Sequence, residues 1–598
     1  MKTKILTLAM LSLALISCDD FLTRDPKDTV KDTPSFWNSE YGIRISVLDY
    51  YTTYFPGYRS GWTRADNFAE TNVADWNDDN AQNKATFFTT VAPTTTTATS
   101  DWNFTRVHGL NLLIERISGN TMEDEPKNHW LGVVRFLRAM EYAGLVSKFG
   151  DVPYYDTTVG SADYKQLYRA RDPRATVMDK VLDDLKFATT HIRVTDGTAG
   201  LVINRDVANA FASRIMLFEG TWQKYREKNN DLAKKYLKEA MDFAKTIMDE
   251  NKYTLCDNYK ALTTSVDLAG NPEIIMYRSY VEGVVTHSLM AFQNTEKEES
   301  SPSRSFVDAF LTKNGLPIHQ VGNTEFKGDT WYFDEITNRD PRLTDNIDAT
   351  GLQLPGVAGV SAASGYFANR FVNESLKNQA GGRSNTCITD APVMKYNEVL
   401  MNYIEAAAEL AGLNAYTLTQ ADFDKTINVI RDRKSTSMPH LTLTGSNLSV
   451  GGVVINDPDR DDDVSSILWE IRRERRTELA YEGLRFNDLR RWSKLQYADM
   501  NLNPKLNKGA WLDKDRYVAW YNETNKAAIA AGTMKAITLE NLESLNLDRS
   551  GNAGYIVPIT KAALLRVYAD KDYLYPIPLD QITLYKSRGY ELKQNPGW

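Results

Sequence analysis

The chain has 598 residues, of which 42% are hydrophobic and 25% charged, values typical of a folded globular protein and not of a disordered or fibrous one. Its formal net charge is −8, which argues against a nucleic-acid partner, because such a partner requires a basic surface to replace phosphate counterions. The 6 histidines and 3 cysteines show neither metal-ligand spacing nor a CxxC motif, so a transition-metal site and a disulfide scaffold are not expected.

The N-terminus predicts export and lipid anchoring. Two lysines precede an apolar run over residues 5–16, which is typical of a secretory signal and is too short to cross ~30 Å of hydrocarbon as a helix. Residues 15–18 (Leu-Ile-Ser-Cys) resemble a bacterial lipobox, which predicts a lipoprotein signal peptide over residues 1–17 and lipidation of Cys18. The alternative is an ordinary signal whose cleavage site happens to precede a cysteine.

Helical periodicity covers much of the chain and is clearest over residues 231–250, where Asp231 is placed to cap the first turn. Further helices are predicted over residues 103–118, 127–148, 175–192, 207–225, 391–410, 422–433 and 465–482. They come as adjacent pairs with short links, which predicts a mostly α fold of tetratricopeptide-like helical hairpins forming a superhelical scaffold. The strict repeat signature itself is absent.

The composition changes between the helical portions. Residues 251–388 are rich in Gly, Pro, Ser and Asn and contain short β-like runs at 273–280 and 365–372, which predicts a loop-rich lobe carrying short β segments. The predicted organisation is therefore an N-terminal helical portion over 18–250, this lobe over 251–388 and a C-terminal helical portion with irregular insertions over 389–598. Cys256 and Cys387 either pair in an oxidising compartment or stay as buried thiols.

Several blocks, in order from Cys18 to Trp598, together resemble the SusD/RagB family of outer-membrane nutrient-uptake lipoproteins. The blocks are Cys-Asp-Asp-Phe-Leu at 18–22, Phe-Gly-Asp-Val-Pro-Tyr at 149–154, Glu-Gly-Thr-Trp at 219–222, Asn-Arg-Asp-Pro-Arg-Leu at 338–343, Pro-Val-Met-Lys-Tyr at 392–396, Glu-Arg-Arg-Thr-Glu-Leu-Ala-Tyr-Glu-Gly at 474–483, Tyr-Pro-Ile-Pro at 575–578 and Gln-Asn-Pro-Gly-Trp at 594–598.

This resemblance implies a SusD-like fold and a non-catalytic protein of polysaccharide utilization. Such a protein is anchored by lipid in the outer membrane, faces the cell exterior, binds oligosaccharide or polysaccharide and delivers it to a SusC-like TonB-dependent transporter. Two alternatives stay open: a lipid-anchored glycoside hydrolase, and a transporter-associated scaffold with a non-sugar ligand. The resemblance implies no cofactor.

The charged residues of the 474–483 block are interpreted as structural. Glu474, Arg475, Arg476, Glu478 and Glu482 lie at helical spacings at which opposite charges can pair across turns.

Aromatic side chains in loops are the candidates for a glycan site, because sugar rings pack their C–H groups on flat aromatic faces while Asn and Asp side chains bind the hydroxyls. The predicted ligand-binding residues are Tyr58, Trp62, Asp66, Asn67, Trp76, Tyr280, Phe292, Asn294 and Trp331. The alternative is that each aromatic fills a gap beneath an irregular loop. The tryptophans within helical patterns are assigned instead to the core: Trp102, Trp130, Trp222, Trp469 and Trp492. Trp598, in the terminal block, is interpreted as structural.

One acidic stretch has the spacing of a calcium loop. Asp459, Asp461, Asp463 and Glu470 occupy positions 1, 3, 5 and 12 of an EF-hand-like register, but Val464 stands where such a loop needs glycine. We interpret the stretch as an acidic loop at a helix N-terminus, with a structural calcium ion as the alternative.

Overall fold

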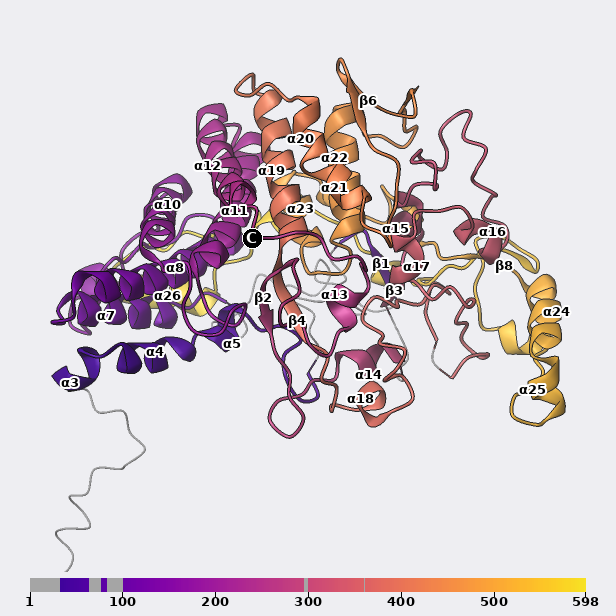
Figure 1. Cartoon of the computed structure of the whole chain (residues 1–598), viewed down its shortest axis with the longest axis horizontal. Helices are drawn as coiled ribbons and strands as arrows, with labels where there is room; N and C mark the ends of the chain where they lie inside the picture. The colour runs from indigo at the N-terminus through magenta and orange to yellow at the C-terminus, as the bar shows by residue number, and fades with distance from the viewer. Residues whose placement is uncertain (1–32, 64–76, 83–100, 295–299, 360) are drawn as a thin grey trace, which may run out of the picture.

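The computed structural model describes residues 33–63, 77–82, 101–294, 300–359 and 361–598. A curved array of long helices forms one side of the molecule, and loops with short helices and strands form the other (Figure 1). The predicted fold class, mostly helical with short β segments, is therefore confirmed. The predicted division of the chain at residues 250 and 389 stays a prediction.

The long helices pack on one another in chain order. In the array, α7 contacts α8, α8 contacts α10, α10 contacts α11, α11 contacts α12, and α12 contacts α19, which in turn contacts α22. Their bounds are α7 (Thr105–Ser118), α8 (Asp124–Phe149), α10 (Arg174–His191), α11 (Arg205–Trp222), α12 (Asn230–Asp249), α19 (Tyr396–Ala411) and α22 (Ser466–Glu478). Short helices α3 (Pro34–Trp37), α4 (Glu40–Leu48) and α5 (Tyr51–Tyr54) precede them, and α4 packs on α8.

The hairpin of α11 and α12 shows why these sequences form closely packed pairs. A Cβ at Gly220 would lie 2.7 Å from Leu237 Cγ and 2.8 Å from Leu237 N, so only glycine permits this approach of the two helices. A π-helical turn, η2 (Gln223–Glu227), joins them. The cap of α12 is Asn229, whose side chain accepts a hydrogen bond from Leu232 N; the prediction of Asp231 was wrong by two residues, because Asp231 lies within the first turn.

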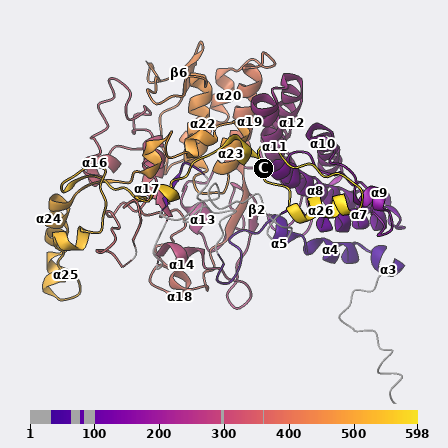
Figure 2. The same ribbon diagram turned by 180° about the vertical axis from the view of Figure 1, so that it is seen from behind.

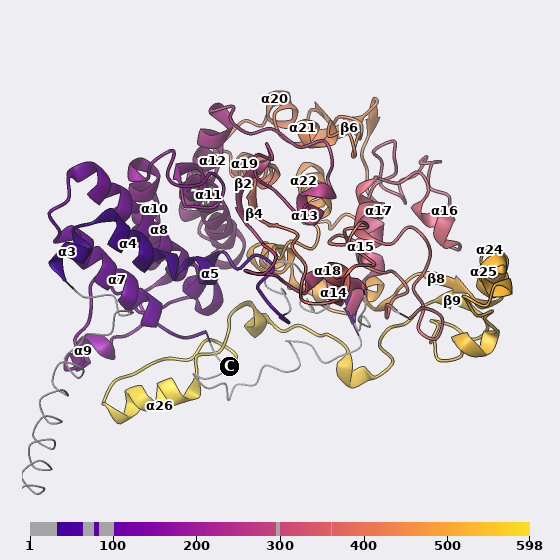
Figure 3. The same ribbon diagram turned by 60° about the horizontal axis from the view of Figure 1, so that its bottom comes forward.

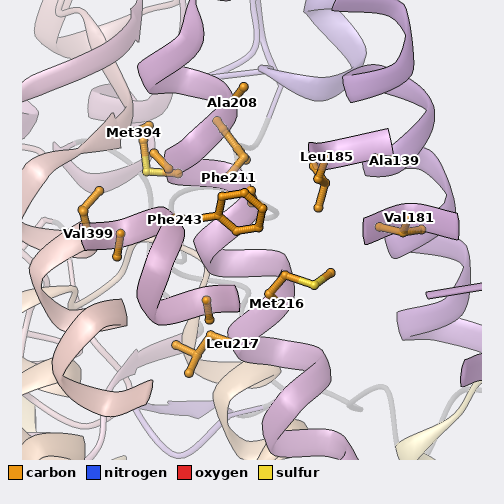
Figure 4. Close-up of a cluster of buried hydrophobic side chains, with 14 of the residues drawn as sticks. Ala139, Val181, Leu185, Ala208, Phe211, Met216, Leu217, Phe243, Met394 and Val399 are labelled. Atoms are coloured by element: carbon orange, nitrogen blue, oxygen red, sulfur yellow. The ribbon is translucent and has the colours of Figure 1, made fainter. Parts of the chain in front are cut away.

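A hydrophobic core runs through the whole array. It extends from Ile43 near the N-terminus to Leu592 near the C-terminus, so helices from both predicted helical portions share it. Figure 4 shows part of it, in which Phe211 and Leu217 of α11 gather with Phe243 of α12.

The irregular side contains small antiparallel sheets. The strands are β1 (Asn80–Gln82), which pairs with β3 (Ser300–Pro302), β2 (Ile274–Arg278), which pairs with β4 (Ala391–Lys395), β5 (Thr442–Thr444), β6 (Asn447–Val450) and β7 (Val453–Val454), which form one sheet, and β8 (Trp511–Asp513), which pairs with β9 (Ala553–Tyr555). The run predicted at 273–280 is thus a strand. The run predicted at 365–372 forms no strand, and its pairing there is an isolated bridge between Ile347 and Ala368.

Further short helices lie on both sides of the molecule. They are α9 (Tyr164–Leu167), α13 (Ala261–Thr264), α14 (Leu289–Asn294), α15 (Arg304–Ala309), α16 (Tyr332–Ile336), α17 (Arg342–Asn346), α18 (Ala380–Arg383), α20 (Gln420–Asp424), α21 (Ile427–Arg431), α23 (Arg485–Arg491), α24 (Lys514–Thr524), α25 (Lys526–Ala530) and α26 (Leu579–Ser587), with 3-10 turns η3 (Leu495–Ala498), η4 (Pro504–Asn507), η5 (Leu539–Leu542), η6 (Ala562–Leu564) and η7 (Asp570–Tyr573).

Two predicted helices in the C-terminal portion are divided. The helix predicted over 391–410 begins with strand β4 and becomes helical only at Tyr396, because β2, more than a hundred residues earlier, supplies a pairing partner. The helix predicted over 422–433 is split into α20 and α21, and Thr426 at the break donates its hydroxyl to Asp422 O at 2.5 Å.

Helix α22 is the centre of a buried ion network. Glu474 pairs with Arg431 and Arg342, and Glu478 pairs with Arg433 and Arg342, all with nearly fully buried side chains. The structural interpretation of the block therefore fits, but its predicted pairing across turns of one helix was wrong. The partners lie on other elements, and Glu482, beyond the end of the helix, pairs with Arg370 and Lys395.

The C-terminus returns to the helical array. Figures 2 and 3 show α26 at the end of the molecule that carries the N-terminal helices, and Tyr585 Oη of α26 donates to Leu167 O of α9 at 3.3 Å. Trp598 Nε1 donates to Lys571 O and Leu574 O, in line with a structural role for this residue. Within the ranges described above, the helices include none with the length and apolar character required to cross a membrane.

Candidate functional site

The two loop segments predicted to carry the site, near residues 60 and 290, meet in the fold. Gly61 N donates to Thr286 O at 3.0 Å, and Ser288 Oγ donates to Thr63 O at 3.2 Å. Tyr280 Oη donates to Arg59 O at 2.7 Å. Residues more than two hundred positions apart therefore form one continuous surface, which we call the Trp62 surface.

Beneath this surface lies a compact layer of aromatic rings. Tyr58 and Tyr280 stack with ring centroids 6.2 Å apart, and both pack edge-on against His287, while Tyr58 also meets Phe371. Tyr58 is 0% exposed and Tyr280 3% exposed. Burial raises the pKa of the Tyr58 hydroxyl well above its usual range, and this hydroxyl donates to Thr263 O at 3.1 Å.

Tyr58 and Tyr280 were predicted to contact the ligand, but both side chains are buried. Their rings are enclosed by protein and have no face free for a sugar. They make the base on which the exposed part of the surface rests.

Trp62 is the exposed aromatic of this surface. Its side chain is 56% exposed, and Phe292 of α14 packs against it edge-on at 6.1 Å and 80°. Phe292 is half-buried, so it supports the indole from one side. The remaining face of the indole is open to solvent and therefore accessible to a ligand.

Asn294 closes α14 and has a structural function. Its Nδ2 donates to Lys377 O at 2.7 Å and to Gly382 O at 2.8 Å, which ties α14 to the loop around α18. The amide group is therefore engaged in holding the loop under the surface. The predicted residues Asp66, Asn67 and Trp76 lie outside the residues that the structure describes.

Trp331 belongs to a different aromatic cluster. It packs on Trp520 of α24 at 5.9 Å and on Phe333 of α16 at 5.8 Å, and the Arg516 guanidinium lies 4.1 Å from its ring centre. Figures 1 and 3 both place α16 and α24 at one end of the molecule, away from α14. The structure therefore separates Trp331, which packs on α16 and α24, from the Trp62 surface, which includes α14.

The acidic stretch predicted as an alternative calcium loop is neutralised by protein cations. Lys494 Nζ lies 2.7 Å from Asp461 Oδ2 and 2.5 Å from Asp463 Oδ1, and Lys505 Nζ lies 2.9 Å from Asp459 Oδ2. Glu470 points elsewhere and pairs with Arg473. Across the described part of the chain no group of three or more His, Cys, Asp or Glu side chains is placed to hold a metal ion. The contacts of this loop favour its interpretation as an acidic loop paired with lysines, and calcium stays the alternative.

The predictions for the core tryptophans and the two thiols had mixed outcomes. Trp102, Trp130, Trp222 and Trp492 are buried, as predicted for core residues, but Trp469 is only half-buried and lines a cavity. Cys256 and Cys387 are both free thiols, which decides between the two alternatives left open by the sequence.

Comparison with known proteins finds similarity to one family. Residues 345–598 match the sequence model of the SusD family. SusD-like protein P25 of Formosa agariphila is 23% identical over 200 residues, which cover 31% of this chain and 37% of that protein, so the match spans little more than a third of the relative's length.

Solved structures match over nearly the whole chain. A SusD-like carbohydrate binding protein of Bacteroides fragilis has a TM-score of 0.65 at 19% identity, covering 92% of this chain and 99% of its own. A second SusD-like protein of that organism has a TM-score of 0.63 at 20% identity, covering 96% of this chain and 100% of its own. At these identities the likeness concerns the fold. The chain thus resembles the SusD/RagB family in the sequence of residues 345–598 and has a SusD-like fold over nearly its whole length.

Proposed function

We propose that this protein is a lipoprotein of the outer cell surface that binds oligosaccharide or polysaccharide at the Trp62 surface and passes it, unaltered, to a SusC-like TonB-dependent transporter. The family supports glycan binding, and a solved relative with the same fold is described as carbohydrate binding. The lipobox-like sequence before Cys18 supports the anchor, and the transporter follows from the family resemblance.

The observation that carries the proposal is the exposed indole of Trp62, which Phe292 contacts edge-on. An unsupported exposed tryptophan would lose side-chain entropy on binding a ligand, at about 0.5–1.5 kcal/mol for each immobilised side chain. Here Phe292 already packs against the Trp62 indole in the absence of ligand, which limits the side-chain entropy that binding would remove. A shallow platform of this kind suits a protein that must capture a glycan and release it again.

The test is affinity for polysaccharides, measured by affinity gel electrophoresis and a glycan array on residues 19–598. Trp62→Ala removes the exposed face, and we expect at least a tenfold loss of affinity with an unchanged circular dichroism spectrum. Tyr41→Ala is the matched control, because Tyr41 is 73% exposed on α4, a helix of the scaffold. Equal affinity in wild type and Trp62→Ala would refute this site.

The same samples separate the alternatives. New reducing ends released from a bound polysaccharide would indicate a hydrolase. No glycan bound, together with intact co-purification of the transporter, would indicate a scaffold. Incorporation of radiolabelled palmitate into wild type and its loss in Cys18→Ala would support the lipid anchor.

A further inference from the structure

A cavity of about 430 Å³ lies between α15, α22 and η4. This volume falls within the range of small-molecule sites, about 300–1,000 Å³. We call it the α15–α22 cavity. Its walls include Ser305 and Asp308 of α15, Trp469 and Arg473 of α22, Tyr497 of η3 and Lys505 of η4.

The charges that line the cavity cancel one another. Every arginine in the lining, and Lys505, forms an ion pair with a carboxylate. Every carboxylate in the lining in turn pairs with one of these cations, and Asp308 also pairs with the neighbouring Arg304. Lys505 Nζ, for example, lies 3.0 Å from Asp308 Oδ2 and 2.9 Å from Asp459 Oδ2, and Arg473 pairs with Asp457. The lining therefore offers no spare charge of either sign to balance an ionic ligand.

Apolar faces stand beside these pairs. Trp469 and Tyr497 are half-buried and held in place at their polar ends, since Trp469 Nε1 donates to Asp457 Oδ2 at 2.7 Å and Tyr497 Oη donates to Asp461 Oδ2 at 2.5 Å. Pro317, Ile318 and Leu502 add aliphatic surface, and the Leu502 side chain is 64% exposed.

The lining also keeps hydrogen-bonding groups that the protein does not use. The half-buried Gln496 amide and the exposed His319 imidazole both line the cavity, and within the described residues neither side chain has a hydrogen-bond partner. Gln496 offers two donors and an acceptor, and a neutral imidazole offers one of each. A ligand with several hydroxyl groups would match this set.

From these observations we infer that the α15–α22 cavity is a second ligand site, which binds one or two residues of a neutral saccharide. An organic anion or amine is disfavoured because every charged group of the lining already has a partner. A purely apolar ligand is disfavoured because it would displace water from the ion pairs and the Gln496 amide and offer these groups no hydrogen bonds in its place. A pyranose has both an apolar face for Trp469 or Tyr497 and hydroxyls for the polar groups.

This second site rests on the proposed function for its biological meaning, since it extends glycan binding to another part of the protein. It lies in a different place from the Trp62 surface. Its walls come from α15, α22, η3 and η4, whereas Trp62 rests on α14, which Figure 1 shows at the lower edge of the molecule. A long glycan could thus be held at the platform while a short product or chain end occupies the cavity.

The experiment is saturation-transfer difference NMR and calorimetry on residues 19–598 with glucose, galactose, mannose, xylose, maltose, cellobiose and laminaribiose, and with inorganic phosphate and glucuronate as anionic probes. The test variant is Gln496→Ala with His319→Ala, which removes the two unused groups and no ion pair. The control is His108→Ala with Gln166→Ala, two exposed residues of α7 and α9. We expect at least one neutral sugar to bind, and its dissociation constant to rise about tenfold in the test variant only.

The outcomes distinguish this inference from the proposed function. Sugar binding that survives Trp62→Ala and is lost in the cavity variant supports the cavity, even if polysaccharide binding at Trp62 has failed. Binding of no neutral sugar, binding of the anionic probes alone, or sugar binding that is lost with Trp62→Ala and unchanged in the cavity variant would overturn it.

Discussion

Glu478 is the carboxylate whose removal tests the ion network most directly. It is fully buried, pairs with Arg433 at 2.7 Å and Arg342 at 2.8 Å, and accepts a hydrogen bond from Asn397 Nδ2 at 2.8 Å. Burial alone would raise its pKa, but the two guanidinium groups and the Asn397 and Arg342 hydrogen bonds lower the pKa to about 2. Relative to its ordinary pKa of 4.5, this corresponds to about 3 kcal/mol of folding stability above pH 4.5.

We predict that Glu478→Gln lowers the free energy of unfolding by about 3 kcal/mol at pH 7, since breaking a buried pair on one side costs about 3–5 kcal/mol. Because the pKa is lowered in the folded state, the wild type loses this stabilisation as the pH falls from 4.5 toward 2. The difference between the two proteins should therefore shrink over that interval.

The measurement is urea denaturation followed by circular dichroism at pH values from 7 to 3. Glu523→Gln is the control, because Glu523 and Lys526 are both exposed and Lys526 Nζ lies 3.5 Å from Glu523 Oε1. We expect no measurable change in the free energy of unfolding for this variant. A loss below about 1 kcal/mol for Glu478→Gln, or a loss that does not depend on pH, would refute the reasoning.

Three further changes test the packing, the thiols and the acidic loop. Gly220→Ala should destabilise the protein by about 1–3 kcal/mol, since its Cβ would collide with Leu237, whereas Gly144→Ala on α8 has open space and should be neutral or stabilising in the same thermal melts. Cys387 is buried and the pKa of Cys256 is raised to about 12 by burial, so Ellman's reagent should leave both thiols unmodified at pH 7.5 and react with both in urea. Millimolar calcium should leave the melting temperature unchanged, because lysines neutralise the acidic loop; a rise would contradict that assignment.

Local pattern was sufficient for the long helices. The apolar stripe over 231–250 predicts α12 to within about a residue at each end. A long apolar stripe on a helix is stable only when it packs against the hydrophobic core, so the pattern alone indicates the helix. The local pattern failed where a strand from a distant part of the chain pairs with the same residues. Residues 391–395 continue the helical spacing of residues 396–410, yet they pair with β2, and Pro392 within them was a local sign against a helix.

The candidate site was predicted in outline only. Aromatics in loops near residues 60 and 290 indicated two segments, and the structure brings these segments together through Gly61 and Ser288. Tyr58 and Trp62 are four residues apart in the same loop, and nothing in their spacing tells which ring is enclosed. The α15–α22 cavity was missed because its walls come from several segments far apart in the chain, and Trp469 follows a helical stripe like a core residue.

By itself the sequence determined the features that depend on neighbours along the chain: the signal-like N-terminus, the amphipathic helices and the motif blocks of the family. Only the tertiary structure decided which charges pair, which aromatic rings stay in solvent and whether the two thiols meet. The physical reason is that burial and ion pairing depend on contacts between residues far apart in the chain. A helix turn is set within a few residues, whereas the fate of Glu478 or Trp62 is set by elements more than a hundred residues away.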